Sequence, residues 1–292
     1  MQLTTIADQS EAALEQQIKS AVQAAREADV AILVLGERAD MSGEAASRAN
    51  VDLPGEQERL LEAVSAVGRP VVLVLLNGRP LAIDWAAEHV PVILEAWYPG
   101  SEGGNAIADV LFGDVNPSGK SPVTWPRTAG AAPLYYAHNR TKSPDDAADF
   151  KSRYWDASSF PLFRFGFGLS YTQFRVSNLR LTETQITPQG TVEVSADVEN
   201  IGKRQGEEVV QLYLHQRAGS AARPVRQLKG FQKVGLASGE KRSVRFAVGP
   251  SELQFWSPVA KAWVVEPETF DIWVGTDVSA TEHVELQVTA AR

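Results

Sequence analysis

Residues 30–50 read VAILVLGERADMSGEAASRAN, an apolar run followed by a polar stretch rich in small residues. The stretch opens with an apolar, β-branched run, Val30 to Leu35, which predicts a buried strand. The residues beyond that run are polar and include three carboxylates, Glu37, Asp40 and Glu44. A helical pattern resumes only at Pro54. A long irregular loop therefore follows the carboxyl end of a buried strand, which is where open α/β sheets place their ligand sites.

The rest of the first half alternates strands with helices. Continuous apolar runs predict strands over residues 30–35, 70–76 and 90–96, and a further short strand is expected at 121–125. Amphipathic spacing and capping residues predict helices over 11–28, 54–67, 81–87 and 102–111. This alternation indicates βαβ units with a mostly parallel sheet covered on both faces. We expect a three-layer α/β sandwich over residues 1–130.

The second half of the chain has a different period. Residues 131–174 are irregular and rich in aromatic side chains, which predicts a packed connector. From residue 175 to 292 apolar residues alternate with polar ones in short runs separated by turn signals. That pattern favours an antiparallel, immunoglobulin-like β-sandwich. The chain has no cysteine, so the fibronectin type III-like form fits better than a disulfide-bonded one. The fold class is thus α/β followed by all-β.

Composition excludes several classes of function. A net charge of −8 argues against a nucleic-acid partner or an anionic membrane surface. The lack of cysteine excludes disulfides, thiolate metal sites and a cysteine nucleophile. None of the four histidines has metal-ligand spacing, so no metal site is predicted. The N-terminal residues have neither the basic nor the apolar region of a signal peptide, and no segment has the length of a membrane span.

The loop carboxylates are the candidates for chemistry. Glu44 lies between Gly43 and Ala45, small neighbours that leave its side chain unobstructed, and a partly desolvated acid there could donate a proton to a leaving oxygen. Residue type alone favours a solvated loop acid instead. Glu37 could accept a hydrogen bond from substrate or cap a helix, and Arg48 could pair with a carboxylate or face water. No GxSxG motif occurs, so serine-triad chemistry has no support.

Several blocks together resemble one enzyme family. They are LGERADMSGEAASRANVDLPGEQERLLEAV, VVLVLLNGRPLAI, ILEAWYPGSEGGNAIADVLFGDVNPSGKSPVTWPR, RYWDASSFPLFRFGFGLSYTQF, VVQLYLHQ, RPVRQLKGFQKVGLASGE and FDIWVGT. The chain resembles the C-terminal part of a glycoside hydrolase family 3 β-glucosidase of the three-domain bacterial, periplasmic kind. The resemblance covers nearly all of the chain beyond Val30.

The resemblance implies a retaining glycosidase that works with two carboxylates. In the family a nucleophilic Asp lies on an N-terminal (β/α)8 barrel, and the acid/base Glu lies in a loop of the following α/β domain. The SGEAASR stretch looks like that loop, so Glu44 is expected to be the acid/base residue. Glu37 is the second candidate, and Ser42 and Arg48 are candidates for orienting Glu44. No barrel pattern is found, and the α/β domain lacks the first strands that the resemblance leads us to expect, so we expect a fragment or one subunit of a split enzyme.

Further expectations follow from the resemblance. The substrate would be a β-linked gluco-oligosaccharide or an aryl glucoside with a terminal non-reducing glucose, and no metal or organic cofactor would be needed. The partner would be a family 3 barrel on the same or a separate polypeptide, without which the isolated chain should be inactive and expose an apolar face. The location would be periplasmic or secreted. Two other classes stay open: a non-catalytic carbohydrate- or protein-binding module, and a β-xylosidase of the same architecture.

Overall fold

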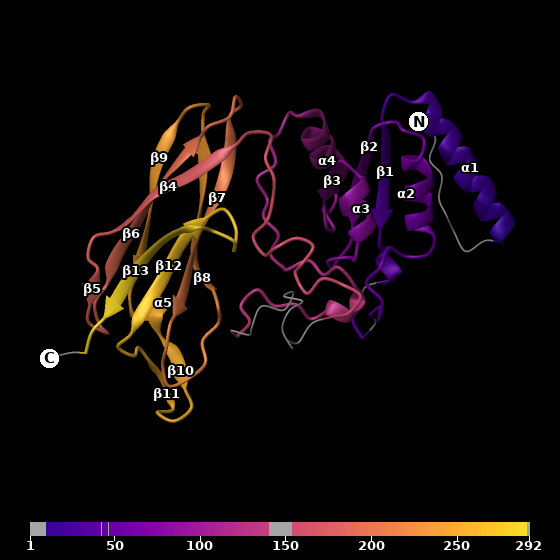
Figure 1. Ribbon diagram of the computed structural model, residues 1–292. Helices are drawn as coiled ribbons and strands as arrows, with labels where there is room; N and C mark the ends of the chain where they lie inside the picture. The colour runs from indigo at the N-terminus through magenta and orange to yellow at the C-terminus, as the bar shows by residue number, and fades with distance from the viewer. Residues whose placement is uncertain (1–9, 42, 46, 140–153, 291–292) are drawn as a thin grey trace. The chain divides into compact units, whose positions relative to one another are not determined.

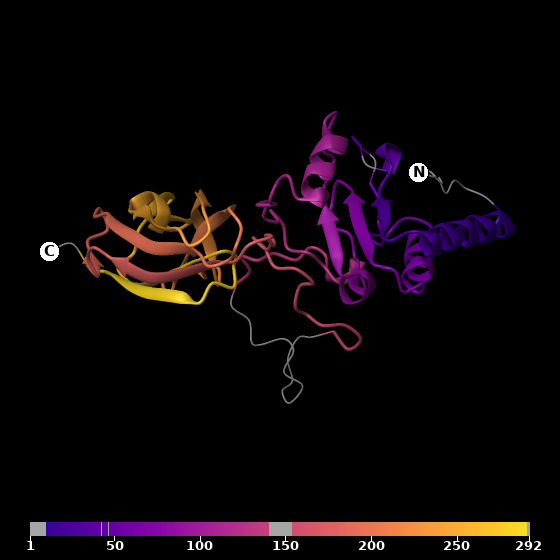
Figure 2. The ribbon, with the colours of Figure 1, turned by 90° about the horizontal axis from the view of Figure 1, so that it is seen from above.

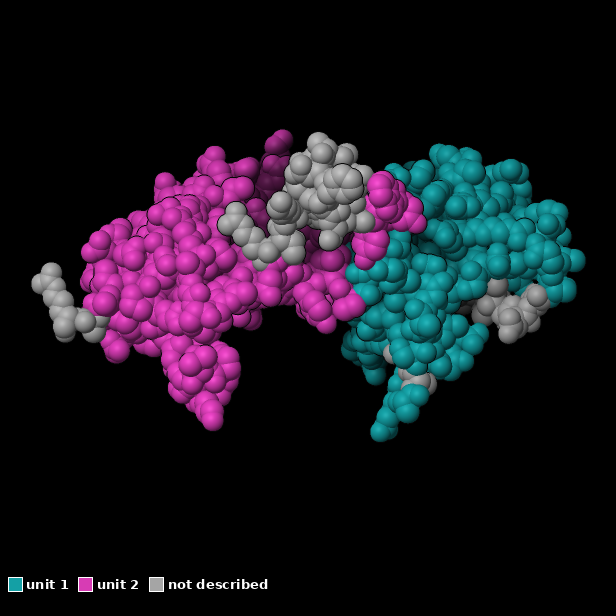
Figure 3. Space-filling view, turned by 60° about the horizontal axis from the view of Figure 1, so that its bottom comes forward, with its two compact units in different colours: residues 1–108, 125–132 teal, residues 109–124, 133–292 magenta. Residues whose placement is uncertain are grey.

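The computed structural model describes residues 10–41, 43–45, 47–139 and 154–290. The chain divides into two compact units, coloured separately in Figure 3. Unit 1 comprises Met1–Ala108 with Trp125–Ala132, and unit 2 comprises Asp109–Thr124 with Pro133–Arg292. Part of the aromatic segment predicted as a connector, residues 140–153, lies outside the described residues.

Unit 1 is built on a parallel sheet of three strands in the order β1-β2-β3. The strands are β1 (Ala31–Gly36), β2 (Val71–Leu76) and β3 (Val92–Glu95), and the helices are α1 (Glu11–Glu27), α2 (Gln57–Ser65), α3 (Asp84–His89) and α4 (Gly103–Phe112). Figures 1 and 2 show α2 and α3 on one side of the sheet and α4 on the other. Helix α1 packs on α2. The predicted α/β architecture is confirmed.

The sheet of unit 1 is buried unevenly. The central strand β2 is apolar throughout, and Leu73, Val74 and Leu75 are fully buried. Strand β1 forms an edge, and its side chains alternate between buried and exposed, with Ile32 49% and Val34 57% exposed. Val92, which lies on the same face through the register Ile32–Val72–Val92, is also exposed. The expectation of two covered faces is therefore wrong at β1, because nothing in the described part of the chain covers Ile32 and Val34, although Val74, which is in register with Val34, is buried.

Unit 2 contains a β-sandwich, and so the prediction from the period-two pattern is confirmed. One sheet has the order β4-β6-β9, made of Phe174–Leu181, Val192–Asn200 and Lys241–Val248. The other has the order β5-β13-β12-β7-β8, made of Gln185–Ile186, Glu282–Val288, Thr269–Gly275, Gly206–Gln216 and Gln227–Leu236. All pairs are antiparallel except β5 with β13. A short helix, α5 (Pro250–Leu253), precedes a hairpin of β10 (Phe255–Ser257) and β11 (Ala262–Val264).

The core of the sandwich lies between its two sheets. Alternate residues of β6 point inward and meet inward residues of β7 and β12, among them Val194, Val198, Leu212, Ile272 and Val274, all of which are buried. Period-two alternation thus places one face of each strand in a common core. The described part of the aromatic connector packs on this unit, since Tyr136 stacks on Phe165 at 4.0 Å and meets Tyr213 edge-on.

The segment 121–125 is not the strand that its apolar residues predict. A short 3₁₀ helix follows this segment at Ala129–Ala131, and another lies in the loop after β1, at Ala39–Met41. Instead of joining a sheet, the segment ends in Trp125, which is buried and donates its indole N–H to the Leu81 carbonyl. The segment is thus held by the buried Trp125 side chain and not by strand pairing. None of the helices in the described ranges has both the length and the apolar character needed to cross a bilayer.

Candidate active site

The loop that carries the candidate acids begins at a glycine whose place cannot be taken by another residue. Gly36 ends β1 with φ 132°, and a Cβ there would lie 2.1 Å from the Leu76 carbonyl oxygen. The Gln57 amide of α2 accepts from the Gly36 N–H at 2.7 Å and donates to its carbonyl at 2.8 Å. Glu37 N–H then donates to Leu76 O at 2.8 Å. The exit direction of the chain from β1 is therefore fixed.

Glu37 is a buried carboxylate held by two arginines. Its side chain has no exposed surface, whereas those of Arg48 and Arg79 are about one-fifth exposed. Arg48 Nη1 lies 3.0 Å from Glu37 Oε1, and Arg79 Nε lies 3.1 Å from the same carboxylate. The Gly78 N–H also donates to it, at 3.4 Å. Arg48 therefore pairs with a carboxylate, as one of its two sequence-based interpretations expected, and that carboxylate is Glu37.

The two arginines tie the loop to the sheet. Arg48 Nη2 donates to the Asp52 carbonyl at 2.8 Å. Arg79 Nη1 donates to Ser47 Oγ at 2.9 Å, and its Nη2 donates to the Met41 carbonyl at 3.3 Å. Residues from the beginning, middle and end of the loop are therefore connected to a single buried negative charge at Glu37. An arginine can do this because its planar fork presents several donors at once.

Glu44 is placed differently from Glu37. Its side chain is exposed on the same loop, and in the described part of the chain its carboxylate makes no hydrogen bond or ion pair. The next residue, Ala45, has φ 56°, a left-handed conformation that non-glycine residues seldom adopt and that recurs at functional sites. The structure brings Arg48 to Glu37 and not to Glu44. Ser42, the other candidate for orienting Glu44, lies outside the described residues.

Asp40 is the third carboxylate of the loop. It is exposed and accepts two hydrogen bonds from Arg38, at 3.0 and 2.9 Å. The hydrogen bond from Arg38 lowers the pKa of Asp40 below its usual value. A general acid must hold a proton at the working pH, so a lowered pKa suits Asp40 poorly for that role.

A further carboxylate at the same sheet edge was missed by sequence reasoning. Glu95 ends β3 and is half-buried, and burial raises its pKa to about 7, although hydrogen bonds from the Trp97 N–H and the Asn77 amide act against that rise. Asn77 is fully buried just beyond β2 and also donates to the Arg79 carbonyl at 2.7 Å. Trp97 has a positive φ of 53°. The three strands thus each lead into a polar residue, Glu37, Asn77 and Glu95, at one edge of the sheet.

Comparison of the sequence with known protein families assigns the chain that carries this site. Residues 1–171 match the family described as Glycosyl hydrolase family 3 C-terminal domain, and residues 208–278 match a Fibronectin type III-like domain. The first match covers more than half of the chain. The chain belongs to glycosyl hydrolase family 3.

Relatives and solved structures agree with this assignment. The Periplasmic beta-glucosidase of Salmonella typhimurium is 46% identical over 89% of this chain, and a Beta-xylosidase of Formosa agariphila is 42% identical over 92%. The beta-glucosidase from Listeria innocua, solved in complex with gluconolactone, superposes on 98% of the chain with a TM-score of 0.91 and 35% identity. The family 3 chain spans 34% and 36% of the two relatives and 39% of the Listeria chain. The predicted family and fold class are confirmed.

The raised pKa of Glu95 makes the stability of this family 3 chain depend on pH. With a folded pKa of about 7 and an ordinary value of 4.5, the folded chain keeps a proton between these two pH values that the unfolded chain loses. Stability should therefore fall as the pH rises from 4.5 to 7, by about 1.4 kcal/mol per unit and up to ~3 kcal/mol in total. Glu95→Gln keeps a neutral group and should remove this slope, so that the variant is more stable than the wild type at pH 8.

Urea unfolding of unit 1 at pH 4, 6 and 8 measures this effect. Glu88→Gln is the matched control, because Glu88 is exposed on α3 and its neutralisation should leave the slope in place. An unchanged slope in Glu95→Gln would assign the pH dependence to another group.

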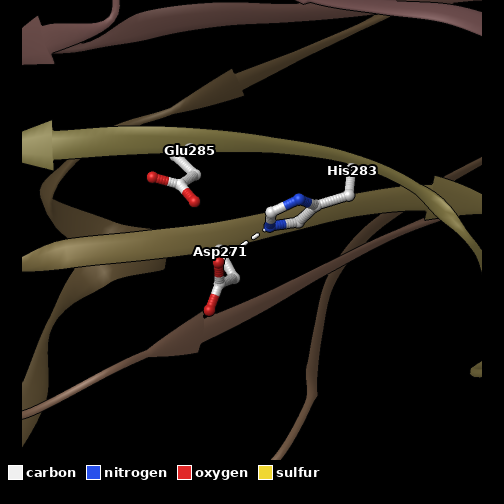
Figure 4. Close-up of side chains that lie close together, drawn as sticks. All are labelled: Asp271, His283 and Glu285. Atoms are coloured by element: carbon white, nitrogen blue, oxygen red, sulfur yellow. Dashed lines mark hydrogen bonds and ion pairs between the residues drawn. The ribbon is translucent and has the colours of Figure 1, made fainter.

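A separate cluster lies on the sandwich, where His283 meets Asp271 and Glu285 (Figure 4). His283 Nε2 lies 2.7 Å from Asp271 Oδ1. Arg217 is also part of the cluster, since its Nη2 donates to Asp271 at 2.7 Å and pairs with Glu285. Burial acts to raise the pKa of Asp271, but hydrogen bonds from Arg217 and His283 outweigh it and lower that pKa. Arg217 already supplies the positive charge these carboxylates require, so the cluster is an ion-pair network.

Proposed function

We propose that this chain is the acid/base-bearing part of a retaining β-glucosidase, with Glu44 as the acid/base residue. Its substrate is a terminal, non-reducing β-D-glucosyl unit of an oligosaccharide or aryl glucoside. In the first step Glu44 protonates the glycosidic oxygen while a nucleophilic carboxylate attacks the anomeric carbon. In the second step the Glu44 carboxylate takes a proton from the water that releases glucose.

The observation that carries this proposal is the contrast among the loop carboxylates. Both oxygens of Glu37 already accept hydrogen bonds from arginines or a backbone N–H, and Asp40 is paired with Arg38. Glu44 is the carboxylate of this loop that is exposed and free of such partners in the described structure, so it can exchange a proton with a substrate. Glu37 then serves to hold the loop rather than to transfer protons.

The nucleophile in this proposal comes from a (β/α)8 barrel. The described residues contain one three-stranded parallel sheet, so the barrel lies outside them, on the same or a separate polypeptide. The uncovered apolar face at Ile32, Val34 and Val92 is the kind of surface on which further protein packs. The Salmonella relative is named as periplasmic, which supports a location in the periplasm or outside the cell.

Hydrolysis of p-nitrophenyl β-D-glucoside tests the proposal. We expect no turnover by the chain alone, and turnover with retained anomeric configuration after it is mixed with the barrel domain of a family 3 enzyme. Rapid hydrolysis by the chain alone would contradict the placement of the nucleophile on the barrel. A lack of activity with every barrel tested, each shown to bind the chain, would contradict the catalytic role.

A β-xylosidase is the second candidate, because one relative with 42% identity carries that name. A xyloside differs from a glucoside by the missing hydroxymethyl group, and such a difference changes kcat/KM only modestly unless the site binds that hydroxyl. The same mixture assayed with p-nitrophenyl β-D-xyloside gives the ratio of the two kcat/KM values, and a ratio in favour of the xyloside would select this candidate.

A further inference from the structure

The turn that follows β2 is hydrogen-bonded to two carboxylates. Glu37, just beyond β1, accepts from the Gly78 N–H at 3.4 Å and from Arg79 Nε at 3.1 Å. Glu95, at the end of β3, accepts from the Asn77 amide, whose Nδ2 lies 3.2 and 3.3 Å from its two carboxylate oxygens. The turn on the central strand is therefore held by acids from both neighbouring strands.

Asn77 connects Glu95 to the backbone of Arg79. Its side chain is fully buried, and Nδ2 donates to the Arg79 carbonyl at 2.7 Å as well as to Glu95. An amide nitrogen carries two hydrogens, so these two acceptors use both of them. Buried donors are rarely left without an acceptor, so the orientation of the amide depends on both partners. The position of the Arg79 carbonyl is thus tied to Glu95.

Arg79 extends this connection to the loop that carries Glu44. Its Nη1 donates to Ser47 Oγ at 2.9 Å, and its Nη2 donates to the Met41 carbonyl at 3.3 Å. Met41 and Ser47 lie three residues before and three residues after Glu44. A displacement of Arg79 would therefore move the loop on both sides of Glu44.

Glu95 can change its charge at this position. In the part of the chain that the structure describes, its carboxylate makes no ion pair and accepts only from the Asn77 amide and the Trp97 N–H. Burial raises its pKa to about 7. The charged groups on the other side of the connection are Glu37 and Arg79. An ionised carboxylate accepts a hydrogen bond more strongly than a neutral one, so ionised Glu95 holds Asn77 more firmly.

We propose that Glu95 is a positioning residue for Glu44 and acts through Asn77 and Arg79. Glu95 touches none of the reacting atoms. Its carboxylate orients the Asn77 amide, the amide fixes the Arg79 carbonyl, and the Arg79 guanidinium holds the loop around Glu44. The consequence for catalysis rests on the proposed role of Glu44, whereas the positioning of the loop does not.

NMR titration of the full chain between pH 5 and 9 tests the positioning without any activity. The Trp97 N–H donates to Glu95 at 2.9 Å, so its chemical shift reports the protonation of that carboxylate directly. We expect Arg79 Nε–H and the Ser47 backbone N–H to shift with the same midpoint, and Glu95→Gln to remove this shared titration. Titration at Trp97 without a response at Arg79 and Ser47, or a response that persists in Glu95→Gln, would overturn the proposal.

Amide hydrogen exchange at pH 8 provides a second test. Glu95→Met removes the acceptor at similar volume, so the Gly78 N–H of the turn should exchange about tenfold faster. Glu95→Gln keeps an acceptor oxygen and should retain most of the protection. The Leu73 N–H, in the buried central strand, is the internal reference and should not exchange faster in either variant. Equal protection of Gly78 in the wild type and both variants would also overturn the proposal.

Cellobiose hydrolysis in the mixture with a family 3 barrel separates this inference from the proposed function. Glu95→Met should lower kcat more than it changes KM, because it displaces Glu44 without removing a substrate contact. Glu95→Gln should recover much of kcat, and Glu88→Gln, an exposed change on α3, should have no effect. Wild-type kcat in Glu95→Met would overturn the positioning of Glu44. An inactive mixture with the NMR response present would count against the proposed function alone.

Discussion

Glu44→Gln should lower the rate of cellobiose hydrolysis by the chain combined with a family 3 barrel by a factor of about 10² to 10⁴. Glutamine has nearly the same shape as glutamate but cannot give or take a proton under these conditions. Because Glu44 is exposed and makes no hydrogen bond within the described residues, the substitution should not change the stability of the chain. The loss would therefore report on chemistry alone.

A substrate with a better leaving group separates the two steps of the reaction in the Glu44→Gln variant. p-Nitrophenolate leaves without protonation, so the first step with p-nitrophenyl β-D-glucoside should stay fast, and the second step, which needs a base, should become limiting. Added azide needs no base to attack the glycosyl-enzyme, so it should restore part of the rate and yield a β-glucosyl azide.

Asp40→Asn is the matched control for Glu44→Gln, because Asp40 is an exposed carboxylate of the same loop. It should keep most of the activity on both substrates. Hydrolysis of cellobiose by Glu44→Gln at the wild-type rate would remove Glu44 from the mechanism, and an equal loss in Asp40→Asn would assign the effect to the shape of the loop.

The secondary structure of unit 1 could be predicted closely because its signals are local. The apolar run from Val30 to Leu35 became the strand Ala31–Gly36, and the helix predicted over 11–28 became Glu11–Glu27. Burial could not be predicted in the same way. A continuous apolar run indicates a strand covered on both faces, yet Ile32 and Val34 are exposed, because their covering layer is not found among the described residues.

The site could be predicted only as far as the loop. A polar stretch after a buried strand identified Glu37, Asp40 and Glu44 together, and the resemblance to a family singled out Glu44. The tertiary contacts had no signal in the sequence, because Arg79 lies 42 residues from Glu37 in the chain. Glu95 was missed for a related reason: its pKa of about 7 comes from burial at the sheet edge, which a single Glu at the end of an apolar run does not reveal.

Glu37→Gln should have the largest effect on the stability of unit 1. The variant leaves Arg48 and Arg79, each about four-fifths buried, without the negative charge that both contact. Removing one partner of a buried ion pair costs about 3–5 kcal/mol, and because the arginines are partly exposed we expect a loss of ~3 kcal/mol here. Urea unfolding at neutral pH measures it. Asp40→Asn, which breaks an exposed pair, is the control and should unfold as the wild type does.

A second substitution separates lost charge from lost shape. Arg79→Met in the Glu37→Gln background removes one of the two unpaired charges, so the double variant should be more stable than the sum of the two single effects predicts. The loop would nevertheless stay loose, because Arg79 also holds Ser47 and the Met41 carbonyl. Mixed with the barrel domain, Glu37→Gln and the double variant should therefore both show a lower kcat. Glu44 lies on that loop, and a small displacement of a catalytic group lowers the rate. Additive stability effects with full activity would show that Glu37 holds neither the arginines nor the loop.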